Sequence, residues 1–291
     1  FGALPFADNT FDLVISRNVT HIIRDHLKVY GEWLRVLRPE GVLLIFDVTE
    51  KMAAETLRRE FSANVSHELK TPLQSILGYA EIMKNGLVQE ADKQRFLEKI
   101  YNEAGHLIIL IDNIMKLSRL DEATGSGSNF EPVELKKLAE ATAARLVSQA
   151  EKKSVTITVS GCEAEIEGVP SVLSEVIYNL VDNGIKYNRE GGRVEVVVSV
   201  SPGEAVLTFK DTGCGISAAD RERVFERFYR VDKSHFKETG GTGLGLSIVK
   251  HGVLFHKGRI ELESELEQGT TIRIILPLSL IHISEPTRHL R

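Results

Sequence analysis

One histidine of this sequence is surrounded by residue types that suit the transfer of a charged group. His67 is followed directly by Glu68, and Thr71 comes one helical turn later on the same face. A neutral imidazole is a competent nucleophile when its second nitrogen can give a proton to a carboxylate, and Glu68 is placed to take that proton. Pro72 follows, and in a helix it leaves the carbonyl of Glu68 without its N–H donor and bends the chain near the histidine.

The spacing of apolar residues predicts that this histidine faces solvent. His67 lies two residues from both Val65 and Leu69, so in a helix its side chain points about 200° away from each of them. An exposed histidine by itself is most often ordinary surface. The acid and the proline beside it favour a functional role.

A second group of polar side chains is predicted on one face of another helix. In the stretch VIYNLVDNGIKYN, Asn179, Asn183 and Lys186 follow one another at spacings of four and three residues. Amide oxygens can bind Mg²⁺ and an ammonium group can bind phosphate. The same residues would also make an ordinary polar face.

Two glycine-rich turns follow this amide helix. In DTGCGI, Asp211 can accept a hydrogen bond from an exocyclic amine, while Gly213 and Gly215 let a flat ring approach the backbone. Residues 240–250, GGTGLGLSIVK, run into a predicted helix, and such turns present N–H groups to phosphates. The residues of this second turn that we assign to a nucleotide are Gly241, Thr242, Gly243, Leu244 and Gly245. Each turn alone is a weak signal, and it is the order of the three elements that indicates a nucleotide site.

Two better-known nucleotide signatures are absent from the sequence. It has no GxxxxGKS/T loop, and the pair Gly243 and Gly245 lacks the third glycine and the preceding strand of a dinucleotide fingerprint.

The histidine lies in a segment with the periodicity of two helices. Between residues 51 and 122, apolar residues recur every three or four positions, with a break at Asn85 and Gly86. This pattern predicts a helical hairpin with one apolar stripe on each helix. Two helices bury little surface alone, so the stripes predict a homodimer that closes a four-helix bundle. Packing against the rest of the chain is the alternative.

The remaining elements predict an α+β chain. Residues 123–129, ATGSGSN, indicate a flexible linker. From 130 to 278, strands at hairpin spacing alternate with helices, which predicts an α/β sandwich domain with a mixed, largely antiparallel sheet and helices on one face. Residues 1–50 predict strand, helix and strand, a βαβ fragment that cannot cover both faces of its own sheet.

The composition excludes several other classes of protein. The chain has 291 residues, 42% of them hydrophobic and 26% charged, with a net charge of −5. This balance is typical of a soluble globular protein and gives no reason to expect binding to nucleic acid. Two cysteines far apart in the sequence indicate a reducing, cytoplasmic location, and no apolar run reaches the roughly 18 residues of a membrane span.

The motifs resemble, in order, those of sensor histidine kinases of two-component systems. HELKTPL around His67 is similar to the HisKA-type phosphoacceptor box. The later motifs resemble the N box, the first glycine box, the F box (RVFERFYRVD from Arg223) and the second glycine box of the GHKL-type ATP-binding domain. The resemblance covers residues 52–278 without a gap.

This resemblance implies a protein histidine kinase that uses ATP and Mg²⁺. It implies that His67 receives the γ-phosphoryl group, that Glu68 acts as base, and that Thr71 positions water for the dephosphorylation of a partner. That partner is a response regulator, whose aspartate takes the phosphoryl group from the histidine. The resemblance also implies that the parent protein is anchored in a membrane, although this chain has no span.

The resemblance further assigns the residues of the nucleotide site. Asn179 and Asn183 would bind Mg²⁺, and Asp211 would bind the adenine amine. The residues placed near the nucleotide or shaping its pocket and lid are Lys186, Tyr187, Gly213, Gly215, Gly241, Gly243 and Gly245, and those of the mobile segment over the phosphates are Phe228 and Arg230.

Two positions bear on how far the resemblance extends. Gly184 stands where the family usually has alanine, at a helix cost of up to about 1 kcal/mol, so we expect the fold to survive with a slightly looser site. A related ATPase of the same fold would carry a catalytic glutamate where this chain has Asn179, which favours transfer to histidine over hydrolysis. A degenerate scaffold that dimerises and binds a regulator without turnover is the alternative function.

The two ends resemble other sequences. LPFADNTFDLVIS and EWLRVLRPEGVLLIFD, within residues 1–47, resemble the fourth and fifth strands of a class I methyltransferase that uses S-adenosylmethionine. The glycine-rich loop that would hold that cofactor is missing, so we expect no methyl transfer. GVLLIFDVTEK also resembles the last strand of a PAS sensor domain, and we interpret residues 1–50 as a fragment joined in a chimera, with a real fusion as the alternative. Residues 278–288 resemble a translated sequencing adapter, and we assign the tail 279–291 no fold.

Overall fold

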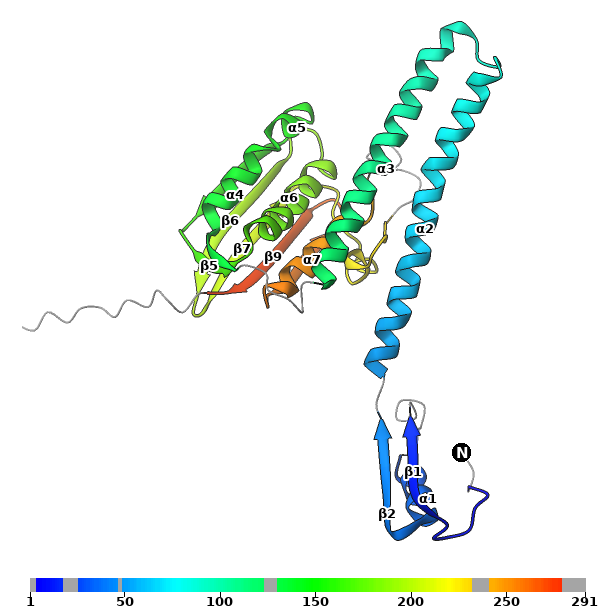
Figure 1. Ribbon diagram of the computed structural model, residues 1–291. Helices are drawn as coiled ribbons and strands as arrows, with labels where there is room; N and C mark the ends of the chain where they lie inside the picture. Colours follow the sequence, from blue (N-terminus) through cyan, green and yellow to red (C-terminus); the bar gives the residue numbers. More distant parts are fainter. Residues whose placement is uncertain (1–3, 18–25, 47–48, 123–129, 232–240, 279–291) are drawn as a thin grey trace, which may run out of the picture. The chain divides into compact units, whose positions relative to one another are not determined.

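The computed structural model describes residues 4–17, 26–46, 49–122, 130–231 and 241–278 (Figure 1). The chain divides into two compact units, Phe1–Glu68 and Leu69–Arg291. The predicted linker at 123–129 and the tail at 279–291 lie outside the described residues. None of the described helices combines the length and the apolar composition that a membrane crossing requires.

The first unit contains the predicted strand, helix and strand. β1 (Phe11–Arg17) and β2 (Leu37–Phe46) pair in parallel, and α1 (His26–Val36) lies between them in the chain. Val29 and Trp33 of α1 pack against one face of the pair. On the other face, four apolar side chains are 41–60% exposed: Leu13, Ile15, Val42 and Leu44. The βαβ fragment therefore leaves one apolar face of its sheet uncovered, as predicted.

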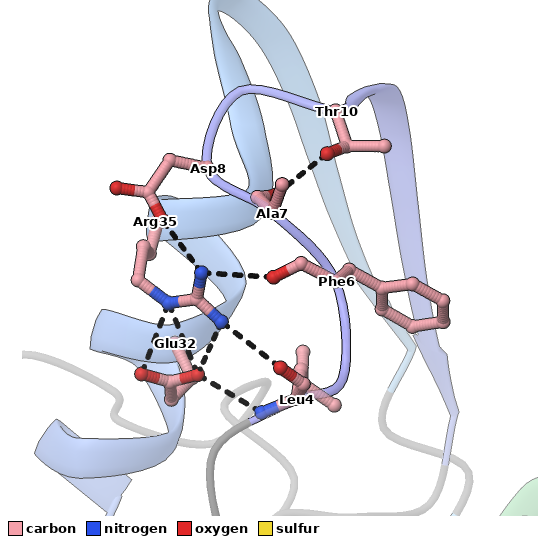
Figure 2. A network of polar contacts seen from close by, with 7 residues as sticks. All are labelled: Leu4, Phe6, Ala7, Asp8, Thr10, Glu32 and Arg35. Carbon is pink, nitrogen blue, oxygen red and sulfur yellow. Dashed lines mark hydrogen bonds and ion pairs between the residues drawn. The ribbon is translucent and has the colours of Figure 1, made fainter.

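A network of polar contacts holds the loop before β1 onto α1 (Figure 2). The guanidinium of Arg35 donates to Glu32 at 2.8 Å and to Asp8 at 2.6 Å. It also donates to the carbonyl oxygens of Leu4 and Phe6 at 3.1 and 3.0 Å. These carboxylates raise the pKa of Arg35, and the guanidinium lowers the pKa of Glu32.

The predicted helical hairpin is present. α2 (Thr49–Lys84) runs without a break through its internal proline, and α3 (Lys93–Glu122) follows a short 3₁₀ turn, η1 (Glu90–Asp92). Gly86, with φ of +69°, ends α2 at the predicted break. Tyr79 of α2 and Phe96 of α3 make an edge-to-face contact at 5.7 Å, which fixes the two helices near their connection.

A five-stranded mixed sheet forms the centre of residues 130–278, which we call the second domain. Its strand order is β4 (Thr156–Gly161), β6 (Arg193–Ser201), β7 (Glu204–Asp211), β9 (Gly269–Pro277) and β8 (Arg259–Glu265). Only the pairing of β4 with β6 is parallel. A separate antiparallel pair joins β3 (Glu131–Glu134) to β5 (Glu165–Gly168).

Helices cover one face of this sheet. α4 (Leu135–Ala144), α6 (Pro170–Lys186) and α7 (Gly245–Phe255) form the layer, and α5 (Val147–Lys152) follows α4 (Figure 1). Alternate residues of the central strands are buried in the core that the helices share, namely Val194, Val196, Val198, Ala205, Leu207 and Phe209. A helical hairpin followed by a sandwich with a mixed sheet is the predicted fold class, which is confirmed.

A buried histidine fixes where α6 begins. His256, 3% exposed, accepts through Nε2 from the N–H of Val169 at 2.9 Å, and its Nδ1 donates to the carbonyl oxygen of Gly252 at 2.7 Å. Val169 immediately precedes Pro170, the first residue of α6, so the imidazole ties the end of α7 to the start of α6. Burial lowers the pKa of His256 because it disfavours the charged ring, while the bond to Gly252 acts in the opposite direction. The neutral ring is the form that can make both bonds.

Candidate functional site

The floor of the candidate site is the turn after β7, residues 211–215, which we call the base loop. Oδ1 of Asp211 accepts from the N–H of Gly213 at 2.8 Å and from the N–H of Thr270 at 3.2 Å. Among the described residues, both bonds to this carboxylate end on Oδ1, which leaves Oδ2 to accept from a ligand. Burial raises the pKa of Asp211, while the two N–H donors act in the opposite direction.

Glycine is required twice in the base loop because other backbone segments pass close to it. A Cβ at Gly213 would lie 2.4 Å from the carbonyl oxygen of Tyr187, and a Cβ at Gly215 would lie 1.9 Å from that of Glu265. Gly215 also has φ of +70°. The N–H of Cys214 donates to the carbonyl of Tyr187 at 3.1 Å. The base loop is therefore held between the end of α6 and the turn that joins β8 to β9.

The predicted amide face of α6 lines the cavity above this loop. Asn179, Asn183 and Lys186 all contribute to its wall. Nδ2 of Asn179 donates to the backbone oxygen of Glu175 at 2.8 Å and to its carboxylate at 3.1 Å, so the amide oxygen is the atom available to a cation. This oxygen lies beside the second glycine turn, where a Cβ at Gly245 would be 2.8 Å from it.

A buried acid positions the lysine of this face. Asp182 is 7% exposed, and its Oδ2 lies 2.6 Å from Nζ of Lys186 one helical turn later. Its Oδ1 accepts from Gln149 of α5 at 2.7 Å. Because both oxygens of the buried carboxylate are satisfied, the ammonium of Lys186 has a defined place at the cavity wall.

The second glycine turn meets the segment of the predicted F box. The N–H of Phe228 donates to the carbonyl of Gly243 at 3.0 Å, and both residues have positive φ, +64° and +70°. α7 then begins at Gly245, with Leu244 as its N-cap. Gly245 and Leu246 line the cavity, so the N–H groups of the first turn of α7, which have no acceptor inside the helix, are available to an anion there.

The structure brings most of the predicted nucleotide residues together around this cavity. The predicted residues that line it are Asn179, Asn183, Lys186, Tyr187, Asp211, Gly215, Arg230, Gly241, Thr242, Gly243 and Gly245. Three others do not line it. Gly213 packs on the end of α6, Phe228 holds the carbonyl of Gly243, and Leu244 is fully buried at the start of α7. These three residues contact neighbours of the wall, and their part in holding a nucleotide stays a prediction.

Sequence reasoning missed several residues of the cavity wall. Asp182, Tyr229 and Thr270 line it and were assigned no role. Asp182 could have been suspected from its spacing of four residues before Lys186. Thr270 is 59 residues from Asp211 in the chain and carries no local signal, since only the pairing of β7 with β9 brings the two together.

The site is tight at Gly184. A Cβ there would meet Cγ2 of Val194 at 3.0 Å and Cγ1 at 3.3 Å, and Cβ of Asp211 at 3.6 Å. The expectation of a looser site at this position is wrong, because the methyl groups of Val194 already occupy the space that an alanine side chain would need.

The predicted phosphoacceptor group lies on α2. The side chain of His67 is 79% exposed, as the apolar spacing predicts, and its Nδ1 lies 3.7 Å from Oε1 of Glu68. Thr71 is also exposed, whereas Pro72 is buried. The imidazole is thus open to solvent with a carboxylate beside one of its two nitrogens.

Three family models match separate parts of this chain. Residues 57–123 match the His Kinase A (phospho-acceptor) domain, and residues 168–280 match the histidine kinase-, DNA gyrase B- and HSP90-like ATPase. Residues 1–45 match a methyltransferase domain.

Curated relatives cover most of this chain. It is 35% identical over 268 residues to the sensor histidine kinase WalK of Bacillus subtilis (strain 168), an alignment that covers 91% of this chain and 42% of WalK. It is 32% identical over 238 residues to the sensor protein SrrB of Staphylococcus aureus (strain N315), covering 81% of this chain and 41% of SrrB. The chain therefore spans less than half the length of these relatives. Since 91% of 291 residues leaves only about 26 outside, the WalK alignment overlaps the segment that the methyltransferase model matches.

Two solved structures share the fold. A crystal structure of full-length ShkA in complex with AMPPNP aligns with a TM-score of 0.56 at 26% identity, covering 76% of this chain and 46% of ShkA. The histidine kinase ThkA, solved in complex with the response regulator protein TrrA, aligns with a TM-score of 0.63 at 20% identity, covering 80% of this chain and 65% of that one.

Proposed function

We propose that this chain, a sensor histidine kinase catalytic core by its matches at residues 57–123 and 168–280, transfers the γ-phosphoryl group of ATP to His67. The observation that carries the proposal is the pairing of two features. One cavity gathers a carboxylate, an amide face and a glycine turn at a helix N-terminus, and an exposed imidazole lies beside a carboxylate on α2.

The base loop supports recognition of adenine. Oδ2 of Asp211 can accept from the exocyclic amine, because Oδ1 is already occupied by two backbone N–H donors. The phosphates would then lie toward Lys186 and the first turn of α7. AMPPNP, an ATP analogue, is bound by ShkA, whose fold this chain shares.

The amide face of α6 fits a hard cation such as Mg²⁺. Its fit rests on Asn179, whose nitrogen is committed to Glu175 and whose oxygen is therefore the free ligand atom. Asn183 lines the same wall one turn later. When bound with ATP, Mg²⁺ would neutralise part of the charge on the phosphates.

The contact between His67 and Glu68 supports a separate role for each nitrogen of the imidazole. Nδ1 faces the carboxylate, so Nε2 is the nitrogen that would attack the γ-phosphorus. The bond from the γ-phosphorus to the bridging oxygen would break, ADP would leave with that electron pair, and the proton on Nδ1 would pass to Glu68. The phosphoryl group would next move to an aspartate of a response regulator, as the complex of ThkA with TrrA suggests. Thr71 would position the water that hydrolyses the aspartyl phosphate of that regulator, which is the phosphatase reaction.

A homodimer would cover the apolar surface that the hairpin leaves open. Several large apolar side chains of α2 and α3 are 44–61% exposed: Leu73, Leu77, Ile108, Ile111 and Met115. A second hairpin packed on this surface would form a four-helix bundle. The parent protein would be membrane-anchored with this core on the cytoplasmic side. Residues 1–50 would be foreign to the kinase, and one uninterrupted gene encoding both parts in long-read sequencing would refute that assignment.

Labelling with γ-³²P ATP tests the phosphoacceptor. We expect His67→Gln to abolish acid-labile label on the full chain while ATP binding is unchanged. His106→Gln, which alters a half-buried histidine of α3, is the matched control and should keep the label. Acid-labile label that persists in His67→Gln would overturn the assignment.

Nucleotide binding separates the kinase from the degenerate scaffold. We expect Asn183→Ala to remove binding of Mg·ATP, measured by filter binding, because it removes an amide oxygen from the cavity wall. Unchanged affinity would contradict the role of Asn183. If the unsubstituted chain bound no ATP, the degenerate scaffold would replace the histidine kinase as the proposed function.

A further inference from the structure

A junction of side chains supports the base loop from the side opposite Thr270. Asn188, just beyond the end of α6, and Thr212, the second residue of the base loop, are joined by a hydrogen bond of 3.1 Å from Oγ1 of Thr212 to Oδ1 of Asn188. Neither residue lines the cavity. We call these two residues, with the backbone of Arg193 between them, the Asn188 junction.

Every hydrogen-bonding position of the Asn188 amide is used. Nδ2 donates to the carbonyl oxygens of Gly184 at 2.8 Å and Arg193 at 3.0 Å. Oδ1 accepts from the N–H of Arg189 at 3.1 Å and from Thr212. A rotation of the amide by 180° would break all four bonds, so the side chain has a single orientation. It links a C-terminal carbonyl of α6 to the first residue of β6.

The threonine completes the connection to β6. Its Oγ1 accepts from the N–H of Arg193 at 3.0 Å, and its own N–H donates to the carbonyl of Arg193 at 3.2 Å. Gly192 leaves room for this arrangement, since a Cβ there would lie 2.0 Å from Oδ1 of Asn188. The residue next to Asp211 is therefore fixed through backbone and side chain at once.

The Asn188 junction affects the orientation of the Asp211 carboxylate. One side of the base loop is held by the N–H of Thr270 and by the β8–β9 turn, as described above. On the other side, Asp211 pairs with Val194 of β6, and Gly213 and Cys214 contact Tyr187. There the Asn188 junction holds Thr212, the residue that follows Asp211. If the junction loosens, Oδ1 and Oδ2 can turn relative to the cavity, and the free oxygen no longer faces a bound base.

We propose that Thr212 and Asn188 are positioning residues that set the selectivity of this site for adenine by holding the Asp211 carboxylate in one orientation. The inference rests on the proposed function, because it requires that the cavity binds ATP. It predicts a loss confined to contacts with the 6-amino group, which a purely structural role would not produce.

The test compares ATP with inosine triphosphate, which has a 6-oxo group in place of the 6-amino group. For Thr212→Val, which keeps the side-chain shape and removes the hydroxyl, we expect the Kd for ATP to rise about tenfold. The Kd for inosine triphosphate should change by less than about twofold, since that ligand gains nothing from the oriented carboxylate. Thr212→Ser keeps the hydroxyl, so the ratio of its Kd for ATP to its Kd for inosine triphosphate should equal that of the unsubstituted chain.

Asn188→Ala provides a second variant should Thr212→Val fold poorly. It retains the bonds between Thr212 and Arg193. Like Thr212→Val, it should raise the Kd for ATP relative to the Kd for inosine triphosphate. Hydrogen exchange of β6 in the full chain checks that the sheet is intact. An unchanged ratio in either folded variant, or an equal loss of affinity for both nucleotides, would overturn the inference. If the unsubstituted chain bound neither nucleotide, the proposed function itself would fail, which is a distinct result.

Discussion

Replacement of Gly184 by alanine tests whether close packing or helix propensity decides the stability of α6. In an exposed helix, alanine is favoured over glycine by about 1 kcal/mol. Here the new Cβ would meet Val194 at 3.0 Å. Val194 is 1% exposed and is paired on both sides, with Ile157 of β4 and Asp211 of β7, so it has little room to move.

The expected magnitude follows from these opposing effects. Overpacking of a core by one methyl group costs about 1 to 3 kcal/mol. With the gain in propensity subtracted, Gly184→Ala should destabilise the domain by about 0 to 2 kcal/mol. In the background of Val194→Ala, which removes both clashing methyl groups, the same substitution should instead stabilise by about 1 kcal/mol.

The free energy of unfolding of this domain is measured by hydrogen exchange of the slowest amides of β6 and β7 in the full chain. The four proteins compared are the unsubstituted chain, Gly184→Ala, Val194→Ala and the double variant. The coupling between the two substitutions should be about 1 to 3 kcal/mol. Gly105→Ala in α3 is the control, because a Cβ there has no neighbour within 4 Å and should only stabilise its helix. If Gly184→Ala changed stability equally in both backgrounds, to within about 0.5 kcal/mol, the packing argument would be refuted.

Three further predictions concern other contacts. Because burial lowers the pKa of His256, the unfolded chain takes up the proton first as the pH falls below 6.5, so the domain should lose up to about 1.4 kcal/mol of stability per pH unit. His256→Gln should remove that part of the slope between pH 6.5 and 5 in hydrogen exchange, and an identical slope would contradict the account. Lys186→Met should destabilise the nucleotide-free domain by roughly 1 to 3 kcal/mol, since buried Asp182 loses its counter-ion while the lysine itself is partly exposed. Lys186→Arg, which keeps the charge, should cost much less. If Lys186→Met were as stable as the unsubstituted chain, the ion pair would be unimportant for stability. Deletion of residues 1–48 should reduce aggregation in light scattering, because it removes the uncovered face of β1 and β2, and should leave ATP affinity within about twofold; unchanged aggregation would mean that this face is covered in solution.

Local patterns predicted the features that depend on one element. The exposure of His67 follows from its distance of two residues from Val65 and Leu69, and the helix period alone fixes that geometry. The common face of Asn179, Asn183 and Lys186 follows in the same way, and all three line one cavity. The hairpin break at Gly86 was readable because glycine adopts positive φ without cost.

Contacts between distant elements could not be predicted in this way. The bond from Thr270 to Asp211 requires the register of β7 with β9, and the bond from His256 to Val169 requires that α7 ends where α6 begins. The residue type does not predict the partner in either case, since threonine and histidine make many different contacts in folded proteins. Both residues were therefore passed over.

Gly184 shows the same division within a single residue. The sequence by itself determined the helix, its polar face and the cost of a glycine in it, because these depend on residues within a few turns of one another. Whether the missing methyl group leaves space was decided by Val194, which the sheet carries to that point from another strand. Chain neighbours thus set which groups this protein can offer to a nucleotide, whereas the pairing of β7 with β9 contributes to deciding which oxygen of Asp211 remains free to bind it.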